Sequence, residues 1–317
     1  MPFVYIIILN WNGLKDTIEC LESLKKITYS NYKMIVVDNG SKNDEGRILK
    51  EKFGDYIHLI KNDKNYGFAE GNNIGIRYAI KNGADYVLLL NNDTVVEPNF
   101  LDEMVKTIEI NKHKKVGAIA AKIKNYFRKN IIDTAWIEVK KTSVLNAAGY
   151  QEKDSFKFNE RKFVFGASGG CALYKKSMLE DLYCRNGYYL DNDLFAYYED
   201  IDLAWRAQYL GWKCIYEPTA VVYHKHSRSL GEDSPLKAYL RVRNHILVLF
   251  KNLPVLLFIK YFIIIMIVQL HKYIVFRRNL YMVLKSQIDA IKKLSYFYKK
   301  RKLILKNLDT KNLNFLS

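Results

Sequence analysis

The sequence lacks the short motifs that mark several common classes of protein. Its four cysteines are widely scattered and form no Cys-x-x-Cys pair, which argues against a zinc site or a disulfide framework and is typical of a reducing compartment. No Gly-x-Gly-x-x-Gly follows the first apolar segment, and no Gly-x-x-x-x-Gly-Lys occurs, so dinucleotide oxidoreductases and P-loop proteins lose their main support. The first apolar run, residues 4–9, is short and has no basic segment before it. It predicts a strand rather than a signal peptide, so we expect the folded chain to stay in the cytoplasm.

The positive charge is concentrated near the C-terminus. The 317 residues include 49% hydrophobic and 26% charged residues, enough for a full core, and the formal net charge is +17. Residues 251–317 contain fourteen Lys and Arg against two acids, which leaves +5 for the first 250 residues. A nucleic-acid enzyme would carry this charge around its cleft, whereas here it lies beside the apolar segment 253–276. This placement favours a membrane surface as partner, and a basic nucleic-acid-binding protein is kept only as an unfavoured alternative.

The first 123 residues alternate between strand and helix signals. Apolar runs at residues 4–9, 34–37, 57–60, 86–90 and 116–123 predict strands, with helices expected at about residues 16–26 and from the loop 65–73 through residue 80. The run 86–90 is apolar on both faces and suits a central parallel strand. Repeated units of strand, loop and helix predict a parallel sheet with right-handed crossovers, whereas residues 124–162 read as an irregular insertion.

Polar clusters follow three of the predicted strands. These are residues 10–12, 38–41 and 91–93, and each stands where ligands bind in open α/β sheets, just beyond the carboxyl ends of the strands. One carboxylate there could accept a hydrogen bond from a nucleotide base, and another could hold a metal ion against a diphosphate. Each cluster alone could be a polar turn. Together they predict a nucleotide site along one edge of the sheet.

Two later segments add candidate residues. Residues 163–170 end in Ser168, Gly169 and Gly170, small residues that allow the backbone to approach a ligand or a neighbouring chain. Residues 195–206 predict a helix that ends at Gly211. Acids at a helix start are usually caps or partners of the helix dipole, and we interpret Glu199 and Asp202 in that way.

Seven segments, in order, carry a resemblance to a known family. They are residues 8–12, 20–24, 36–41, 65–73, 90–94, 195–206 and 211–224. Across residues 4–229 the chain resembles the family 2 glycosyltransferases, in particular their rhamnosyltransferase-like branch. The resemblance implies an α/β fold of the GT-A type, a Rossmann-like and mostly parallel sheet flanked by helices.

The resemblance also implies a role for each matching residue. Asp93 stands last in the family's Asp-x-Asp metal motif, with Asn91 in place of the first Asp, and His224 completes the metal site. A mixed oxygen and nitrogen set suits Mn²⁺ or Mg²⁺. Asp200 is the catalytic base, and Asp38 accepts a hydrogen bond from a uracil or thymine ring. The residues implied to bind the nucleotide sugar are Asn10, Asn12, Asp38, Asn65, Gly67, Asn72 and Asn92, while Ser168, Gly169, Gly170 and Glu199 border the acceptor.

These roles describe an inverting, metal-dependent glycosyltransferase. The expected reaction moves a hexose or rhamnose from a uridine or thymidine diphosphate sugar to a hydroxyl of a saccharide or lipid-linked acceptor, in cell-surface glycan synthesis. The diphosphate leaves with the help of a divalent cation, and a base activates the incoming hydroxyl on the opposite face of the sugar. Because Asn91 replaces an Asp, a catalytically weak sugar-nucleotide-binding protein remains the alternative.

The C-terminal segment is expected to contact the membrane. A spanning helix needs about 20 apolar residues, but residues 255–276 are interrupted by Lys260, Gln269, His271 and Lys272. Residues 280–294 repeat apolar positions at helical spacing opposite lysines, which suits an amphipathic helix on anionic lipid. We therefore expect a catalytic domain at 1–235, with a nucleotide-binding half at about 1–123 and an acceptor half at about 124–235, and a basic tail at 236–317. The tail would hold the enzyme on the cytoplasmic face of the membrane, as a peripheral or monotopic protein; packing on the catalytic domain or on a second subunit is the alternative.

Overall fold

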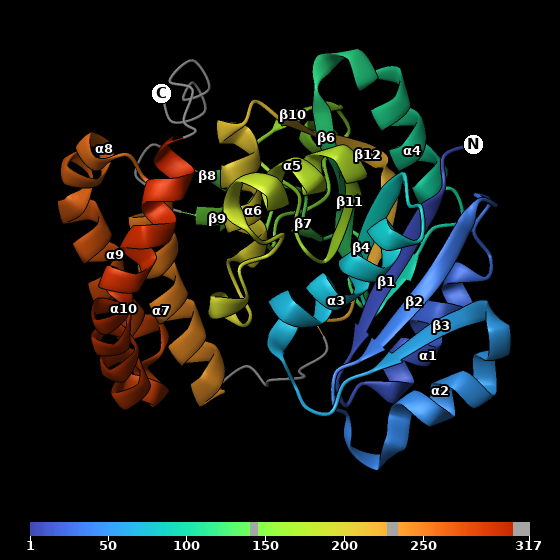
Figure 1. Cartoon of the computed structure of the whole chain (residues 1–317), viewed down its shortest axis with the longest axis horizontal. Coiled ribbons are helices and arrows are strands. Elements are labelled where there is room, and N and C mark those ends of the chain that lie inside the picture. The colour runs from blue at the N-terminus through green and yellow to red at the C-terminus, as the bar shows by residue number, and fades with distance from the viewer. Residues whose placement is uncertain (140–144, 227–233, 307–317) are drawn as a thin grey trace.

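A computed structural model describes residues 1–139, 145–226 and 234–306 of the chain (Figure 1). Parts of the expected insertion, catalytic domain and tail, at residues 140–144, 227–233 and 307–317, lie outside the described residues. The first half alternates strands and helices as follows: β1 (Val4–Asn10), α1 (Leu14–Leu24), β2 (Tyr32–Asp38), α2 (Glu45–Phe53), β3 (Ile57–Lys61), α3 (Gly67–Lys81), β4 (Tyr86–Asn91), β5 (Thr94–Val96) and α4 (Phe100–Ile110).

The second half completes the sheet and adds four helices at the end. Its elements are β6 (Val116–Asn125), β7 (Ile132–Thr134), β8 (Ile137–Val139), β9 (Leu145–Ala147), β10 (Lys162–Val164), β11 (Cys171–Lys175), α5 (Lys176–Asn186), α6 (Glu199–Tyr209), β12 (Lys213–His224), α7 (Pro235–Asn252), α8 (Val255–Lys260), α9 (Phe262–Val275) and α10 (Leu280–Lys306). The five expected strands are all present, each slightly longer than its apolar run.

The main sheet has the strand order β10-β12-β6-β11-β4-β1-β2-β3. Strands β4, β1, β2 and β3 run parallel, as expected from the repeated units. The sheet is mostly parallel, as expected, and β11 inserts antiparallel between β4 and β6. The register places Asn10 opposite Asp38, and Leu9 opposite Asn91. The carboxyl ends of the three strands that precede the polar clusters therefore lie side by side.

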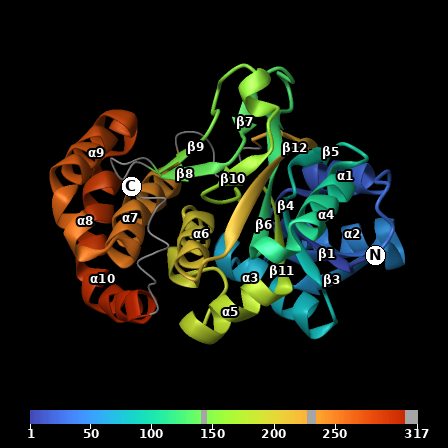
Figure 2. The same ribbon diagram turned by 90° about the horizontal axis from the view of Figure 1, so that it is seen from above.

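Helices cover both faces of the sheet. Because side chains alternate along a strand, Ile6 and Ile8 face one hydrophobic core with α1 and α4, while Tyr5 and Ile7 face a second core with α3, α5 and α6. Burial on both faces explains why the central strands read as continuous apolar runs rather than alternating ones. Figure 2 shows the resulting layers and places α6 between the sheet and the C-terminal helices.

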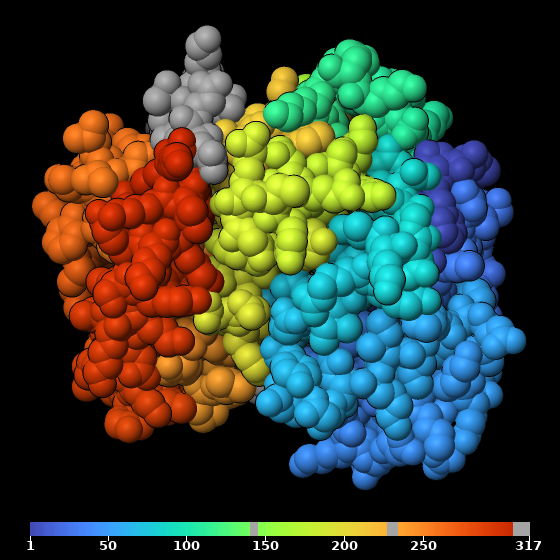
Figure 3. Space-filling view, in the orientation of Figure 1, coloured from blue at the N-terminus to red at the C-terminus, as the bar shows by residue number. Residues whose placement is uncertain are grey.

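The C-terminal helices form a block against α6 (Figure 3). Helices α6, α7, α9 and α10 share a third hydrophobic core, to which α10 contributes Ala290, Phe297 and Ile304. Val283, seven residues before Ala290, is also buried and continues this stripe. Of the apolar positions expected to face lipid, Leu284 and Ile288 lie exposed, whereas Val283 is buried. The helix carries apolar residues around most of its circumference, so its periodicity alone did not identify the packed side. Across the described ranges, no helix combines the length and the hydrophobicity needed to cross a bilayer.

Candidate active site

The ends of β1 and β2 hold a buried hydrogen-bond cluster around Asp38. The Asn10 amide donates to Asp38 Oδ1 at 3.3 Å, to Ser41 Oγ at 3.0 Å and to Glu45 Oε2 at 2.9 Å. Asp38 also accepts hydrogen bonds from the backbone nitrogens of Ser41 at 3.3 Å and Gly46 at 3.2 Å, and it is only 3% exposed. The carboxylate is therefore held in one orientation at the rim of the sheet.

Asn39, which the sequence did not single out, organises the neighbouring loop. Its amide donates to Asn65 Oδ1 at 3.0 Å and to the Gly67 carbonyl at 3.1 Å, and its Oδ1 accepts from Asn62 at 2.9 Å. Gly67 has φ +83°, and an added Cβ would lie 2.5 Å from the Phe195 carbonyl oxygen. The loop entering α3 thus touches the segment before the predicted catalytic helix, and only glycine fits at that contact.

The other asparagines implied to bind the nucleotide sugar contact the protein itself. Asn12 accepts a hydrogen bond from the Lys42 nitrogen at 2.8 Å, and Asn92 donates to Thr17 Oγ1 at 2.9 Å. Asn72 is 2% exposed and donates to the Phe68 carbonyl within α3 at 2.9 Å. These bonds fix the loops of the rim.

The two residues implied to hold the metal ion lie in direct contact. His224, at the end of β12, places Nε2 3.1 Å from Asp93 Oδ1 and Nδ1 2.8 Å from Asp133 Oδ2. Burial alone would lower the pKa of His224, but the carboxylates of Asp93 and Asp133 raise it to about 10. The position thus stabilises positive charge. Asn91 Nδ2 lies 3.3 Å from the same imidazole Nε2, so the residue that replaces an Asp also faces this position.

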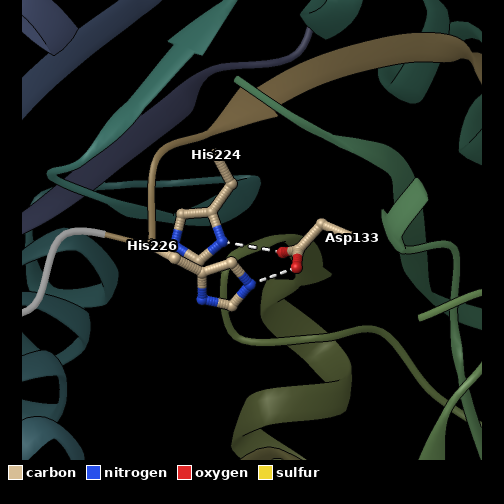
Figure 4. Close-up of side chains that lie close together, drawn as sticks. All are labelled: Asp133, His224 and His226. Carbon is tan, nitrogen blue, oxygen red and sulfur yellow. Dashed lines mark hydrogen bonds and ion pairs between the residues drawn. The ribbon is translucent and has the colours of Figure 1, made fainter. Parts of the chain in front are cut away.

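Asp133 and His226 extend this cluster and were missed by the sequence reasoning (Figure 4). Asp133 contacts both imidazoles, and its carboxylate with His224 and His226 could hold a metal ion. The two histidines, despite the burial of Asp133, lower the pKa of its carboxyl to about 2. The two histidines stand two residues apart in the sequence, and this spacing could have indicated that both side chains point to the same side. Asp133 had no such signal, because it lies in the irregular insertion, 91 residues from His224.

Asp200 begins α6 and faces a cavity. Its Oδ2 accepts a hydrogen bond from the Gly169 nitrogen at 2.9 Å, and its Oδ1 accepts from the Ile201 nitrogen at 2.8 Å. Burial raises the pKa of the Asp200 carboxyl above its usual value, although both backbone donors oppose the shift. A carboxylate with a raised pKa is a better proton acceptor, which suits a general base. Neighbouring Glu199 is buried, does not line the cavity, and leaves Oε2 without a partner among the described residues.

The sequence predicted a helix over residues 195–206. In the structure, the segment before Asp200 is instead a loop. Phe195, Tyr197 and Tyr198 all have positive φ, of 68°, 69° and 73°, which is costly for aromatic residues. One side chain of α7 holds this loop, since the Asn244 amide donates to the carbonyls of Leu194 and Ala196, each at 2.8 Å, and of Tyr197 at 2.9 Å. The C-terminal helices therefore shape the segment that presents Asp200.

Asp202 is a member of a buried ion-pair network and not a simple helix cap. It contacts Arg206 at 2.9 Å and Lys251 of α7 at 2.7 Å. Lys251 also contacts Asp191, which pairs with Lys300 of α10 at 2.5 Å. This network joins α7 and α10 to the catalytic helix.

A cavity of about 1190 Å³ separates Asp200 from the C-terminal helices. Ser168, Asp133 and His226 line it beside Asp200, while the nucleotide-rim residues Asn10 and Asp38 do not. Gly169 contacts Asp200 directly, and an added Cβ on Gly170 would lie 3.2 Å from Ile123. Asp200, Asp133 and His226 thus line a space large enough for a ligand of sugar size.

Comparisons with known proteins identify the family and the fold. The model of the family described as Glycosyl transferase family 2 matches residues 5–183, more than half of the chain. The chain therefore belongs to the family 2 glycosyltransferases, and it has the expected GT-A fold. Asp133, Asp200 and His224 lie outside the first 123 residues, whereas Asp93 lies within them.

Individual relatives show how far the likeness extends. The chain is 26% identical over 272 residues to the dTDP-rhamnosyl transferase RfbF of Shigella flexneri, covering 81% of this chain and 83% of that protein. It spans only 26%, 62% and 61% of the length of three other curated relatives.

Two solved structures share the fold. The mannosyltransferase PcManGT from Pyrobaculum calidifontis, in complex with GDP-Man and Mn²⁺, has a TM-score of 0.56 at 16% identity and covers 99% of this chain and 87% of its own. S. aureus TarS 1-349 in complex with UDP-GlcNAc has a TM-score of 0.56 at 16% identity, covering 96% and 89%. At these identities the likeness shows the fold alone.

Proposed function

We propose that the protein transfers a sugar, with inversion, from a uridine or thymidine diphosphate donor to a hydroxyl of a glycan or lipid-linked acceptor. The observation that carries this proposal is the arrangement of Asp38, Asp93 and Asp200 in the chain order and on the elements that the family requires. RfbF, a dTDP-rhamnosyl transferase, and TarS, bound to UDP-GlcNAc, support a pyrimidine nucleotide and a hexosyl or rhamnosyl group.

Asp38 is proposed to read the base. Its carboxylate is fixed by Asn10 and by two backbone donors, so it can accept a hydrogen bond from the N3–H of a pyrimidine without reorganising. A purine presents a different edge to the same oxygen. The loop held by Asn39, with Asn65 and Gly67, would close over the nucleoside.

Asp93 and His224 are proposed to hold a divalent cation, with Asp133 behind His224. The oxygen and nitrogen donors in contact here suit Mn²⁺ or Mg²⁺, and PcManGT was solved with Mn²⁺. Asp133 orients the His224 ring through Nδ1, the usual arrangement behind a ligating histidine. Such a cation, when bound, stabilises the negative charge of the leaving diphosphate.

Asp200 is proposed to remove the proton from the acceptor hydroxyl. Its position on the cavity wall, and a pKa raised by burial, suit that task. The Gly169 nitrogen and the loop held by Asn244 keep the carboxylate in place. Attack from this side, opposite the diphosphate, inverts the anomeric centre.

The catalytically weak binder stays as a second candidate because Asn91 stands where a second carboxylate is usual. The structure gives Asn91 a contact with His224 and no negative charge. Thermal unfolding with a panel of nucleoside diphosphates and their sugars, with and without Mn²⁺, tests both candidates. The proposed enzyme is stabilised by pyrimidine diphosphates more strongly with Mn²⁺ and consumes the matching donor. Binding without consumption of any donor would leave the weak binder, and absence of nucleotide binding would refute both.

A membrane surface is proposed as the partner of α8, α9 and the start of α10. Many large apolar side chains are exposed there, including Leu256 (81%), Ile263 (73%) and Ile274 (69%), with Lys260 and Lys292 exposed among them. Exposed apolar residues with basic residues among them suit the interface of an anionic leaflet, with the enzyme facing the cytoplasm. A second subunit on the same face is the competing occupant.

The membrane proposal is tested with full-length variants. Removing residues after 234 would expose Asp191 and Asp202, which Lys251 pairs inside the protein, so truncation is not a clean test. The native chain should float with anionic liposomes, and Leu256→Asp/Ile263→Asp should not. Ile110→Asp, on α4 at 57% exposure, is the control and should float like the native chain. Equal behaviour of all three proteins would refute the membrane surface.

A further inference from the structure

We propose that the cavity beside Asp200 binds a phosphate group carried by the acceptor, with Arg241 and Arg277 as its ligands. This inference rests on the proposed function, since it assigns the acceptor to this cavity. It adds a chemical requirement to the proposed function: the acceptor carries negative charge at a distance from the hydroxyl that reacts.

The two walls of the cavity differ in chemistry. The catalytic wall presents Asp200 and Asp133, whereas the opposite wall consists of α7 and the segment after α9 and presents Lys237, Arg241, Arg277 and Arg278. Arg277 and Arg278 are exposed, and Arg241 is half-buried. Four cations on one wall raise the local concentration of an anion and favour one that spans the cavity.

Arg241 and Arg277 are the cations available to such a ligand. Other basic residues of the lining are already engaged: Lys225 contacts Asp16 at 2.7 Å and Glu19 at 2.6 Å. By contrast, Arg241 and Arg277 have no carboxylate partner within the described ranges; Arg241 hydrogen-bonds to the Tyr198 hydroxyl and lies over the Phe276 ring at 5.9 Å. Arginine binds phosphate through paired N–H groups, and stacking on an aromatic ring orients its plane.

The donor diphosphate does not account for this wall. Its proposed place is at Asp93 and His224, and neither Asp93 nor the base-reading Asp38 lines the cavity. The cationic wall lies with Asp200, on the acceptor side. The volume of about 1190 Å³ exceeds that of a typical small-ligand site, so it leaves room for sugar between the phosphate and Asp200.

The position of the wall also suits a phosphate joined to a lipid. Val275 and Phe276 line the cavity next to Arg277. Val275 is 53% exposed and continues the apolar surface that includes Ile274. A hydrocarbon chain lying on that surface would place its phosphate at Arg277. A phosphate within a soluble glycan would use the same arginines without the apolar surface.

Binding of decyl phosphate and of inorganic phosphate, measured by calorimetry on the full chain, tests the proposal. The native protein should bind decyl phosphate at least about tenfold more tightly than Arg241→Gln/Arg277→Gln, because two charged donors are lost. The single variant Arg277→Gln changes an exposed residue and should show part of the loss. The control is Lys299→Gln, an exposed cation of α10 outside the cavity, which should bind like the native protein.

The outcomes separate this inference from the proposed function. Tighter arginine-dependent binding of decyl phosphate than of inorganic phosphate supports a lipid-borne phosphate, and equal arginine-dependent binding supports a phosphate of a soluble glycan. Binding that is absent, or that ignores both arginines, overturns the site. Stabilisation by a pyrimidine diphosphate with Mn²⁺ is measured on the same variants and should be retained. If the pyrimidine diphosphate with Mn²⁺ does not stabilise the native protein, the proposed function is refuted, whatever the phosphate result.

Discussion

Replacing Lys251 by methionine tests whether the C-terminal helices are a structural part of the catalytic unit. The ammonium of Lys251 is fully buried and contacts the equally buried carboxylates of Asp191 and Asp202. Methionine keeps most of the aliphatic stem and removes the charge. The variant therefore isolates the ion pairs between α7 and the segment around α6.

The expected cost follows from the partners that remain. Removing one member of a buried ion pair costs about 3–5 kcal/mol. Asp191 keeps Lys300 at 2.5 Å, and Asp202 keeps Arg206 at 2.9 Å, so we expect the lower end of that range, about 3 kcal/mol. For a chain of this length the entropy of unfolding is about 0.7 kcal/mol/K, which converts 3 kcal/mol into a fall in Tm of about 4–5 °C.

The assay compares urea and thermal unfolding of the native chain, Lys251→Met and Lys299→Met. Lys299 is an exposed residue of α10, and its replacement should change the free energy of unfolding by less than about 0.5 kcal/mol. If Lys251→Met lowers the free energy of unfolding by less than about 1 kcal/mol, the reasoning is refuted. The buried ion pairs would then not be needed to hold the C-terminal helices against the rest of the protein.

Three further predictions concern single residues. Asp38→Ala should raise the KM for pyrimidine donors, and equal use of purine donors by the native enzyme would remove its proposed role. Burial lowers the pKa of His245 to about 3, so between about pH 6.5 and pH 3 only the unfolded chain binds a proton at this residue. The free energy of unfolding should therefore fall by up to about 1.4 kcal/mol for each unit that the pH drops in this range. His245→Asn should reduce this slope in pH-dependent urea titrations. Asn244→Ala should lower kcat more than it changes nucleotide binding, because the loop before Asp200 loses the amide to which its carbonyls are hydrogen-bonded. An unchanged kcat would contradict the positioning role of Asn244.

The sequence predicted that three polar clusters meet at one edge of the sheet, and it could do so for a physical reason. Strands buried on both faces give continuous apolar runs, and their carboxyl ends must meet at one edge in a parallel sheet. The clusters beginning at Asn10, Asp38 and Asn91 therefore could be assigned to one rim, and the strand register brings them together. This assignment uses only the local pattern of each strand and does not require contacts between residues far apart in the sequence.

The remaining site depends on contacts that no local pattern contains. Asp133 reaches His224 from an irregular insertion, and Asn244 reaches the Leu194 carbonyl across 50 residues of chain. The positive φ values at Phe195 and Tyr197 are imposed by such contacts, against the preference of aromatic residues. In α10, apolar residues on several sides hid which stripe, Val283 to Ile304, packs inside.

The most direct test of the proposed mechanism is donor turnover by Asp200→Asn with the donor selected in the nucleotide panel. The base has a pKa raised by burial and acts as the carboxylate, so native turnover should fall at acidic pH as Asp200 becomes protonated. Asp200→Asn should lower turnover by about 10²- to 10⁴-fold while Mn²⁺-dependent nucleotide stabilisation stays near that of the native protein. Asp93→Ala and His224→Ala should instead lose that stabilisation. Full turnover by Asp200→Asn would contradict the assignment of the base and, with it, the proposed mechanism.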